Sequence, residues 1–273
     1  MHKIKYLPKS LNLYLTYKCG SYCQHCFLVQ KNMLNTSELN FTDIIDILDD
    51  AMKAKVFLIP LTGGEPLFHP NFFEIVHAIR KRNMLPFLGS SSVLIDLPMA
   101  IELEKSGISC VQLSLDHSNA DFHDKVRGQG SFNRTLMSLD NLKQTNLKII
   151  VAVCIDKNNY LAIEEIINLL YSYKVNSIKI QFYKNFHGNK INELTNEQIE
   201  QCINKCKLFM CNINNLNFIH ATNMKSEIAT IHNESLSIGA NGFIYLGNAE
   251  KSIGHIKNGK VSEIYNNYLQ SLS

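Results

Sequence analysis

The sequence lacks the features that mark membrane-spanning and secreted proteins. No apolar run in its 273 residues approaches the length of a membrane span, and the N-terminal stretch Met-His-Lys-Ile-Lys-Tyr-Leu-Pro has no signal-peptide core. The formal net charge is only +3, too small to indicate a nucleic acid or a membrane surface as a partner. We therefore expect a cytoplasmic protein with neither of these partners.

The cysteines are numerous for a chain without a secretion signal. All eight are expected to be reduced thiols, for which metal binding or catalysis is a commoner use than a disulfide. With 45% hydrophobic and 19% charged residues the composition is that of an ordinary globular protein, and the length allows one large core with a small appendage.

Strand-like and helix-like segments alternate over about two-thirds of the chain, which predicts βα units and a parallel sheet. The expected strands are residues 11–17, 56–62, 85–91, 109–115, 147–155 and 176–183. The expected helices are residues 38–54, 70–83, 97–106, 131–145, 160–173 and 195–211. Six such units form either an open barrel or a doubly wound sheet, and the periodicity alone does not separate the two.

Several of these strands alternate apolar and polar residues, although helix-covered parallel strands are usually apolar on both faces. The polar phase contains Cys110 and Ser114 in the fourth strand, Cys154 in the fifth, and Lys179 and Gln181 in the sixth. A polar face opposite the helices suits the lumen of an incompletely closed barrel. This favours an α/β fold with a partial six-unit TIM-like barrel, whose chemistry would lie at the C-terminal strand ends.

Three cysteines follow the first strand, in the stretch Tyr17-Lys-Cys-Gly-Ser-Tyr-Cys-Gln-His-Cys26. Thiolates from Cys19, Cys23 and Cys26 could hold three irons of a cubane cluster and leave the fourth iron open for chemistry. Zinc is an alternative, but zinc prefers four ligands and no further Cys or His follows closely. A chance group of buried cysteines is the other alternative.

A glycine turn follows the second strand, in Leu61-Thr-Gly-Gly-Glu-Pro66. Paired glycines often serve only a tight turn. Here the turn ends a strand next to the first one, so bare backbone and Glu65 are expected to approach the cysteine loop. They could bind a polar ligand on the open iron there.

Taken together, these motifs resemble the radical S-adenosylmethionine (radical SAM) superfamily over residues 11 to about 190. Further matches are Ser114-Leu-Asp116, His123-Asp-Lys-Val-Arg-Gly128, Gly130-Ser-Phe132 and Asn158-Asn159. The resemblance implies a six-unit partial barrel, a [4Fe–4S] cluster on the three cysteines, and S-adenosylmethionine on the fourth iron.

The same resemblance assigns cofactor contacts to individual residues. Gly63, Gly64 and Glu65 would hold the methionine amino group, Ser114 and Arg127 would contact the ribose or the carboxylate, and His25 would lie beside the adenine. The third strand departs from the family pattern, because Ser90-Ser91-Ser92 stands where many members have Thr-Asn-Gly.

Residues 213–273 are expected to form a small extension to a core of residues 1–212, with a hairpin at Asn241-Gly242 and a helix from Val261. The extension resembles a SPASM or twitch domain, but no cysteine follows Cys211, so the usual auxiliary-cluster ligands are missing. Cys202 and Cys206 share an apolar helical stripe, which favours core packing for these two and for Cys211 over a second cluster.

The resemblance implies an enzyme that cleaves S-adenosylmethionine to a 5′-deoxyadenosyl radical and removes hydrogen from a substrate C–H bond. We expect a ribosomal peptide as substrate and an external electron donor such as flavodoxin or ferredoxin. Without an evident second cluster, redox-neutral epimerisation is favoured, with Cys154 or Cys110 as hydrogen donor. The alternatives are a sugar or other small-molecule substrate, thioether or carbon–carbon cross-linking, and a non-catalytic iron–sulfur or zinc regulator.

Overall fold

The computed structural model describes residues 7–21, 23–26, 28, 37–184, 192–212, 217–221, 235–247 and 252–272. The strands are β1 (Leu11–Thr16), β2 (Leu58–Gly63), β3 (Leu85–Gly89), β4 (Cys110–Ser114), β5 (Lys148–Ile155), β6 (Ser177–Phe182), β7 (Asn217–Ala221), β8 (Leu236–Ile238), β9 (Phe243–Leu246) and β10 (Ser252–His255). The α-helices are α2 (Phe41–Lys53), α3 (Phe72–Lys81), α4 (Leu97–Ser106), α5 (Ala120–Arg127), α6 (Ser131–Leu142), α7 (Ile163–Ser172), α8 (Asn196–Asn212) and α9 (Val261–Ser271). None of these helices is both long and apolar enough to cross a bilayer.

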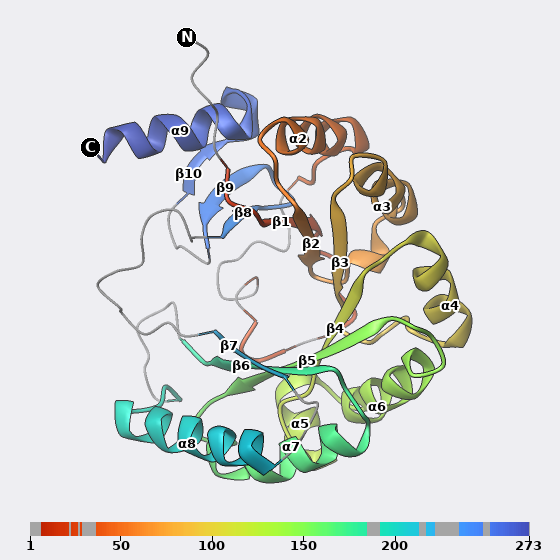
Figure 1. The fold of residues 1–273 in the computed structure, drawn as a ribbon, viewed down its shortest axis with the longest axis vertical. Coiled ribbons are helices and arrows are strands. Elements are labelled where there is room, and N and C mark those ends of the chain that lie inside the picture. Colours follow the sequence, from red (N-terminus) through yellow and green to blue (C-terminus); the bar gives the residue numbers. More distant parts are fainter. Residues whose placement is uncertain are drawn as a thin grey trace.

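All the described strands belong to one curved sheet in the order β10-β9-β8-β1-β2-β3-β4-β5-β6-β7. The six predicted strands, β1 to β6, pair with their neighbours in parallel, as βα units require. Figure 1 shows the sheet as an arc with the helices on its outer side, open between its two ends. The predicted α/β partial barrel is therefore confirmed.

The core lies between this arc and the helices. Leu113, Val151 and Ile178 are fully buried there, and they occupy the apolar phase of their strands. Ser114, Cys154, Lys179 and Gln181, from the polar phase, are only half-buried. The alternation in the sequence therefore predicted which side chains remain accessible inside the barrel, except for Cys110, which belongs to the polar phase and is buried.

Helix α5 and the strands β7 and β10 were not predicted. Helix α5 is short and polar, and the residue that it buries is a histidine, His123, in place of an apolar side chain. It begins where the Asn119 side chain accepts a hydrogen bond from the Asp121 backbone N–H, and it ends at Gly128, whose φ is +100°. Strand β7 has five residues and extends the barrel by pairing in parallel with β6. Strand β10 has four residues and pairs antiparallel with β9. These elements were missed because their position depends on tertiary pairing more than on local pattern.

The predicted hairpin at Asn241-Gly242 is present as β8 and β9, and the predicted terminal helix begins at Val261 as α9. β8 pairs in parallel with β1, so the hairpin continues the barrel sheet beyond its first strand. The hairpin also reaches the start of the cysteine loop, because the Tyr17 hydroxyl donates to Asn241 Oδ1 at 3.0 Å.

The buried carboxylate of Asp50 connects helix α9 to helix α2 by hydrogen bonds. Asp50 of α2 accepts hydrogen bonds from the backbone N–H and the hydroxyl of Ser262, both at 2.7 Å, and so caps α9 from another helix. Asp50→Ala would leave two buried donors unpaired, which costs about 1–3 kcal/mol per group. We expect a clear fall in the denaturant midpoint.

Asp49→Ala is the matched control for this change. Asp49 is the neighbouring residue, and its carboxylate makes an ion pair with Arg82 at 2.7 Å while remaining 41% exposed. Exposed pairs contribute about 0–1 kcal/mol, so this variant should unfold close to the wild type. Equal midpoints for the two variants would show that Asp50 does not anchor α9.

Candidate functional site

The loop that follows β1 carries Cys19, Cys23 and Cys26, three half-buried free thiols. In Figure 1 the segment after β1 lies on the inner side of the arc. No three His, Cys, Asp or Glu side chains among the described residues converge on one point as a single metal ion requires. A cubane cluster does not require such convergence, since each thiolate binds a different iron. The three thiols therefore suit a cluster better than a lone zinc ion.

The thiols of Cys19 and Cys23 are protonated until a metal displaces the proton. Burial raises the pKa of Cys19, and it raises the pKa of Cys23 to about 11 although Arg127 acts in the opposite direction. Thiolate formation at Cys23 is thus coupled to metal binding and to the positive charge beside it.

The glycine turn at the end of β2 packs directly against the base of the cysteine loop. The Gly64 N–H donates to the Thr16 carbonyl and the Glu65 N–H donates to the Lys18 carbonyl, each at 2.8 Å. A Cβ on Gly64 would lie 2.1 Å from the Lys18 carbonyl oxygen, so only glycine permits this approach. The structure therefore brings together the two motifs that were predicted to meet.

Glu65 itself is fully buried and turned toward the loop after β3. One carboxylate oxygen accepts from the Ser90 hydroxyl at 2.9 Å, from the Ser91 hydroxyl at 2.6 Å and from the Ser91 N–H at 2.7 Å. Burial raises the pKa of Glu65, and these donors oppose the rise. The serine run that departs from the family pattern therefore has a role in this chain, since it supplies hydrogen bonds to Glu65.

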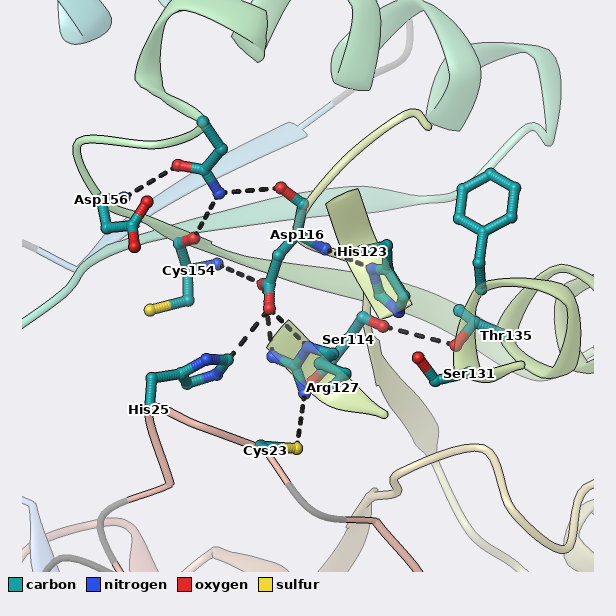
Figure 2. Close-up of polar contacts among 12 residues, drawn as sticks. Cys23, His25, Ser114, Asp116, His123, Arg127, Ser131, Thr135, Cys154 and Asp156 are labelled. Atoms are coloured by element: carbon teal, nitrogen blue, oxygen red, sulfur yellow. Dashed lines mark hydrogen bonds and ion pairs between the residues drawn. The ribbon is translucent and has the colours of Figure 1, made fainter. Parts of the chain in front are cut away.

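Asp116, two residues after β4, is the centre of a buried polar network on the other side of the cysteine loop. Figure 2 shows its carboxylate surrounded by Arg127, His25 and the backbone of Cys154. Arg127 donates to it from Nε and Nη2, the Cys154 N–H donates at 2.9 Å, and His25 Nε2 lies 3.7 Å away. Burial would raise the pKa of Asp116, but Arg127 and His25 hold it below the usual value.

Two further side chains fix Asp116 through its backbone. The Asp116 N–H donates to His123 Nδ1 at 3.1 Å, and the Asn159 amide donates to the Asp116 and Cys154 carbonyls, both at 2.8 Å. Burial lowers the pKa of His123 to about 4, so its ring is neutral with the proton on Nε2. Asp116, His123 and Asn159 belong to the motifs that match the family, but their contacts with one another are visible only in the folded chain.

The network also reaches the cysteine loop from the end of α5. The Gln24 N–H donates to the Val126 carbonyl at 2.8 Å, and Arg127 Nη1 lies 3.9 Å from Cys23 Sγ. His25 and Arg127, both predicted to contact the cofactor, are thus brought together with Asp116. Ser114, the last residue of β4, is half-buried nearby.

The two candidate hydrogen donors, Cys154 and Cys110, lie at opposite ends of their strands: Cys154 is near the C-terminal end of β5, and Cys110 begins β4. The Cys154 thiol is half-buried and projects beside His25 and Asp156 (Figure 2). Cys110 is buried at the first residue of β4, opposite Phe87, six positions before Asp116, which is roughly 20 Å along a strand. Only Cys154 is placed close to the cysteine loop.

Comparison with known proteins agrees with this geometry. The family described as the radical SAM superfamily matches residues 13–170, more than half of the chain. Among curated proteins, mycofactocin maturase MftC of Mycolicibacterium smegmatis is 34% identical over 149 residues, 54% of this chain and 38% of that protein. Fe-coproporphyrin III synthase of Methanosarcina barkeri is 28% identical over 186 residues, 68% of this chain and 46% of that protein. The chain thus matches less than half the length of either relative.

Among solved structures, Streptococcus suis SuiB bound to precursor peptide SuiA has the same fold. It superposes with a TM-score of 0.78 at 16% identity, covering 96% of this chain and 65% of that chain. The cofactors implied by the sequence resemblance, a [4Fe–4S] cluster and S-adenosylmethionine, are those that this superfamily uses. With three cysteines, the glycine turn and the partial barrel in one arrangement, the chain belongs to the radical SAM superfamily.

Proposed function

We propose that this chain is a radical SAM enzyme that modifies a peptide without net oxidation, most simply by inverting an α-carbon. The observation that carries the proposal is the half-buried Cys154 thiol, fastened through its backbone to the Asp116 network beside the cysteine loop. Such a thiol could return a hydrogen atom to a substrate radical inside the barrel.

In this proposal Cys19, Cys23 and Cys26 ligate three irons of the cluster. Gly63, Gly64 and Glu65 hold the methionine amino group through their backbone, since the Glu65 carboxylate is fully buried against Ser90 and Ser91. Ser114, Arg127 and His25 contact the rest of S-adenosylmethionine. When bound, the cluster and S-adenosylmethionine supply a 5′-deoxyadenosyl radical that takes hydrogen from a C–H bond. The barrel residues position that bond and keep water away from it.

Cys154 has the properties that a hydrogen-atom donor needs. Burial and the Asp116 carboxylate raise the pKa of Cys154 well above its usual value, so the group remains a thiol with an S–H bond to give. As the S–H bond breaks, a C–H bond forms on the substrate carbon. One electron from an external donor such as flavodoxin or ferredoxin, and one proton from solvent, then convert the sulfur radical back to the thiol.

The C-terminal hairpin supports a redox-neutral reaction. We propose that residues 213–273 are a SPASM- or twitch-like extension that has lost its clusters, since no cysteine follows Cys211. Its hairpin instead pairs with β1 and contacts Tyr17. The extension then serves to hold the start of the cysteine loop, and no second cluster in it accepts an electron from the substrate.

A peptide substrate is supported by the likeness to SuiB, which was solved with a precursor peptide, and to a maturase. A small-molecule substrate is the second candidate. It is favoured by the match to Fe-coproporphyrin III synthase, which covers 68% of this chain. Incubation of the reconstituted enzyme with a peptide encoded beside its gene decides between them by product mass.

The epimerisation proposal is tested in deuterated water with Cys154→Ala and Cys110→Ala. We expect the wild type and Cys110→Ala to add one deuterium at one inverted centre. Cys154→Ala should still form 5′-deoxyadenosine but no inverted, labelled product. Inverted product without deuterium, or normal labelling by Cys154→Ala, would contradict the role of this thiol.

A further inference from the structure

The guanidinium of Arg127 lies between a carboxylate and a cysteine thiol. Its Nε and Nη2 donate to the two oxygens of Asp116, and its Nη1 lies 3.9 Å from Cys23 Sγ (Figure 2). Both charged side chains are largely buried, with 15% of Arg127 and 4% of Asp116 exposed. The positive charge of Arg127 therefore lies next to Cys23 Sγ, and the negative charge of Asp116 lies behind it, farther from the same sulfur.

This arrangement is rigid at both ends. Asp116 is held through its carboxylate by the Cys154 N–H, and through its backbone by His123 and Asn159. The bond between the Gln24 N–H and the Val126 carbonyl joins the cysteine loop to the last turn of α5, one residue before Arg127. The distance from the guanidinium to Cys23 is thus set by the folded chain and not by a freely moving side chain.

A charge at this position acts on the electron affinity of a cluster bound there. Reduction adds a negative charge to the cluster, and a nearby cation stabilises that charge more strongly in a partly buried site than in water. An N–H group directed at a ligating sulfur acts in the same direction, and hydrogen bonds to sulfur are among the factors that set iron–sulfur potentials. Asp116, on the far side of the guanidinium, opposes both effects.

We propose that Arg127 and Asp116 form a charge pair that sets the reduction potential of the cluster, with Arg127 raising the potential and Asp116 limiting the rise. The proposal rests on the part of the proposed function that places a cluster on Cys19, Cys23 and Cys26. It is independent of the substrate and of the hydrogen donor.

This role is distinct from a contact with S-adenosylmethionine. A guanidinium has five N–H donors, and the contacts to Asp116 and Cys23 account for three of them. Two remain for a ribose or carboxylate oxygen. A purely ligand-binding Arg127 would alter the affinity for S-adenosylmethionine and leave the potential of the ligand-free cluster unchanged.

The test is an anaerobic redox titration of the reconstituted full chain without S-adenosylmethionine or peptide, followed by electron paramagnetic resonance. Arg127→Met should lower the midpoint potential and Asp116→Asn should raise it, each by the equivalent of about tenfold in the one-electron constant, about 59 mV. Lys125→Met removes the same charge from an exposed position of α5 and should leave the potential unchanged.

Iron and sulfide content, measured on each variant, separate a changed potential from a lost cluster. If Arg127→Met does not take up a cluster, Arg127→Lys and Asp116→Asn decide the question, since lysine keeps the charge and loses the paired geometry. Wild-type potentials in loaded variants, or shifts of the same sign for Arg127→Met and Asp116→Asn, would overturn the proposal. Neither result depends on turnover, so a failure here is distinguishable from a failure of the epimerisation proposal.

Discussion

Gly64→Ala is expected to remove most of the cluster from the reconstituted protein while the barrel stays folded. The added Cβ would lie 2.1 Å from the Lys18 carbonyl oxygen, and this neighbour is backbone, which cannot rotate away. The cysteine loop and the glycine turn must then separate, and the bonds from Gly64 to Thr16 and from Glu65 to Lys18 are lost.

The size of the effect follows from the cost of overpacking. Extra carbon in a closely packed position costs about 1–3 kcal/mol, and every 1.4 kcal/mol is a factor of about ten in an equilibrium. If the loop moves to relieve the contact, the arrangement that can bind the cluster becomes roughly tenfold rarer or more. The total stability of a domain is about 5–15 kcal/mol, so the barrel itself should survive.

Gly89→Ala is the matched control, at the end of the neighbouring strand β3. A Cβ there would lie 3.6 Å from the Thr62 hydroxyl, which is an ordinary contact. Iron and sulfide per chain and the thermal midpoint by circular dichroism should be near the wild type for this variant. Normal cluster content in Gly64→Ala would show that the close approach to Lys18 is not needed to hold the loop.

The meeting of the glycine turn and the cysteine loop could be predicted because it depends only on strand order. β1 and β2 are neighbours in a parallel sheet, so their C-terminal ends, and the loops that follow, lie together. The same logic placed Cys154 nearer the site than Cys110, since both are on the polar phase and Cys154 lies nearer the C-terminal end of its own strand. The alternation of apolar and polar residues, and the position of a residue along its strand, can both be read from the sequence alone.

The Asp116 network could not be predicted in the same way. Its contacts join Asp116 to His123, Arg127 and Asn159, and two of these residues lie on α5, a short polar helix that buries a histidine and no apolar side chain. The bonds from Ser90 and Ser91 to Glu65 are similar, because nothing local in a run of three serines specifies a carboxylate 25 residues away. Side-chain pairing across loops depends on tertiary geometry, which one sequence does not display.

The second large effect concerns the number of clusters. Replacing Cys19, Cys23 and Cys26 together by alanine is expected to remove all cluster iron and all formation of 5′-deoxyadenosine, because these cysteines hold the one cluster that the proposed function places in this chain. The wild type should bind about four irons per chain, as one [4Fe–4S] cluster requires.

The matched control is Cys202→Ala with Cys206→Ala. These two thiols are 1% and 7% exposed and pack in the main hydrophobic core from α8, where a cysteine behaves as a small apolar side chain. Their replacement should lower the thermal midpoint somewhat and leave all four irons in place. The two sets of variants thus separate a thiol that binds iron from a thiol that fills space.

Iron counts also decide how the substrate radical is quenched. If the wild type held about eight irons and the Cys202/Cys206 double variant about four, a second cluster would exist, and an oxidative reaction with an internal electron acceptor would replace epimerisation. If both hold about four, an electron from the substrate radical has no acceptor cluster in this chain. The proposed reaction then has the hydrogen atom supplied from the barrel wall, by the Cys154 thiol near the cysteine loop.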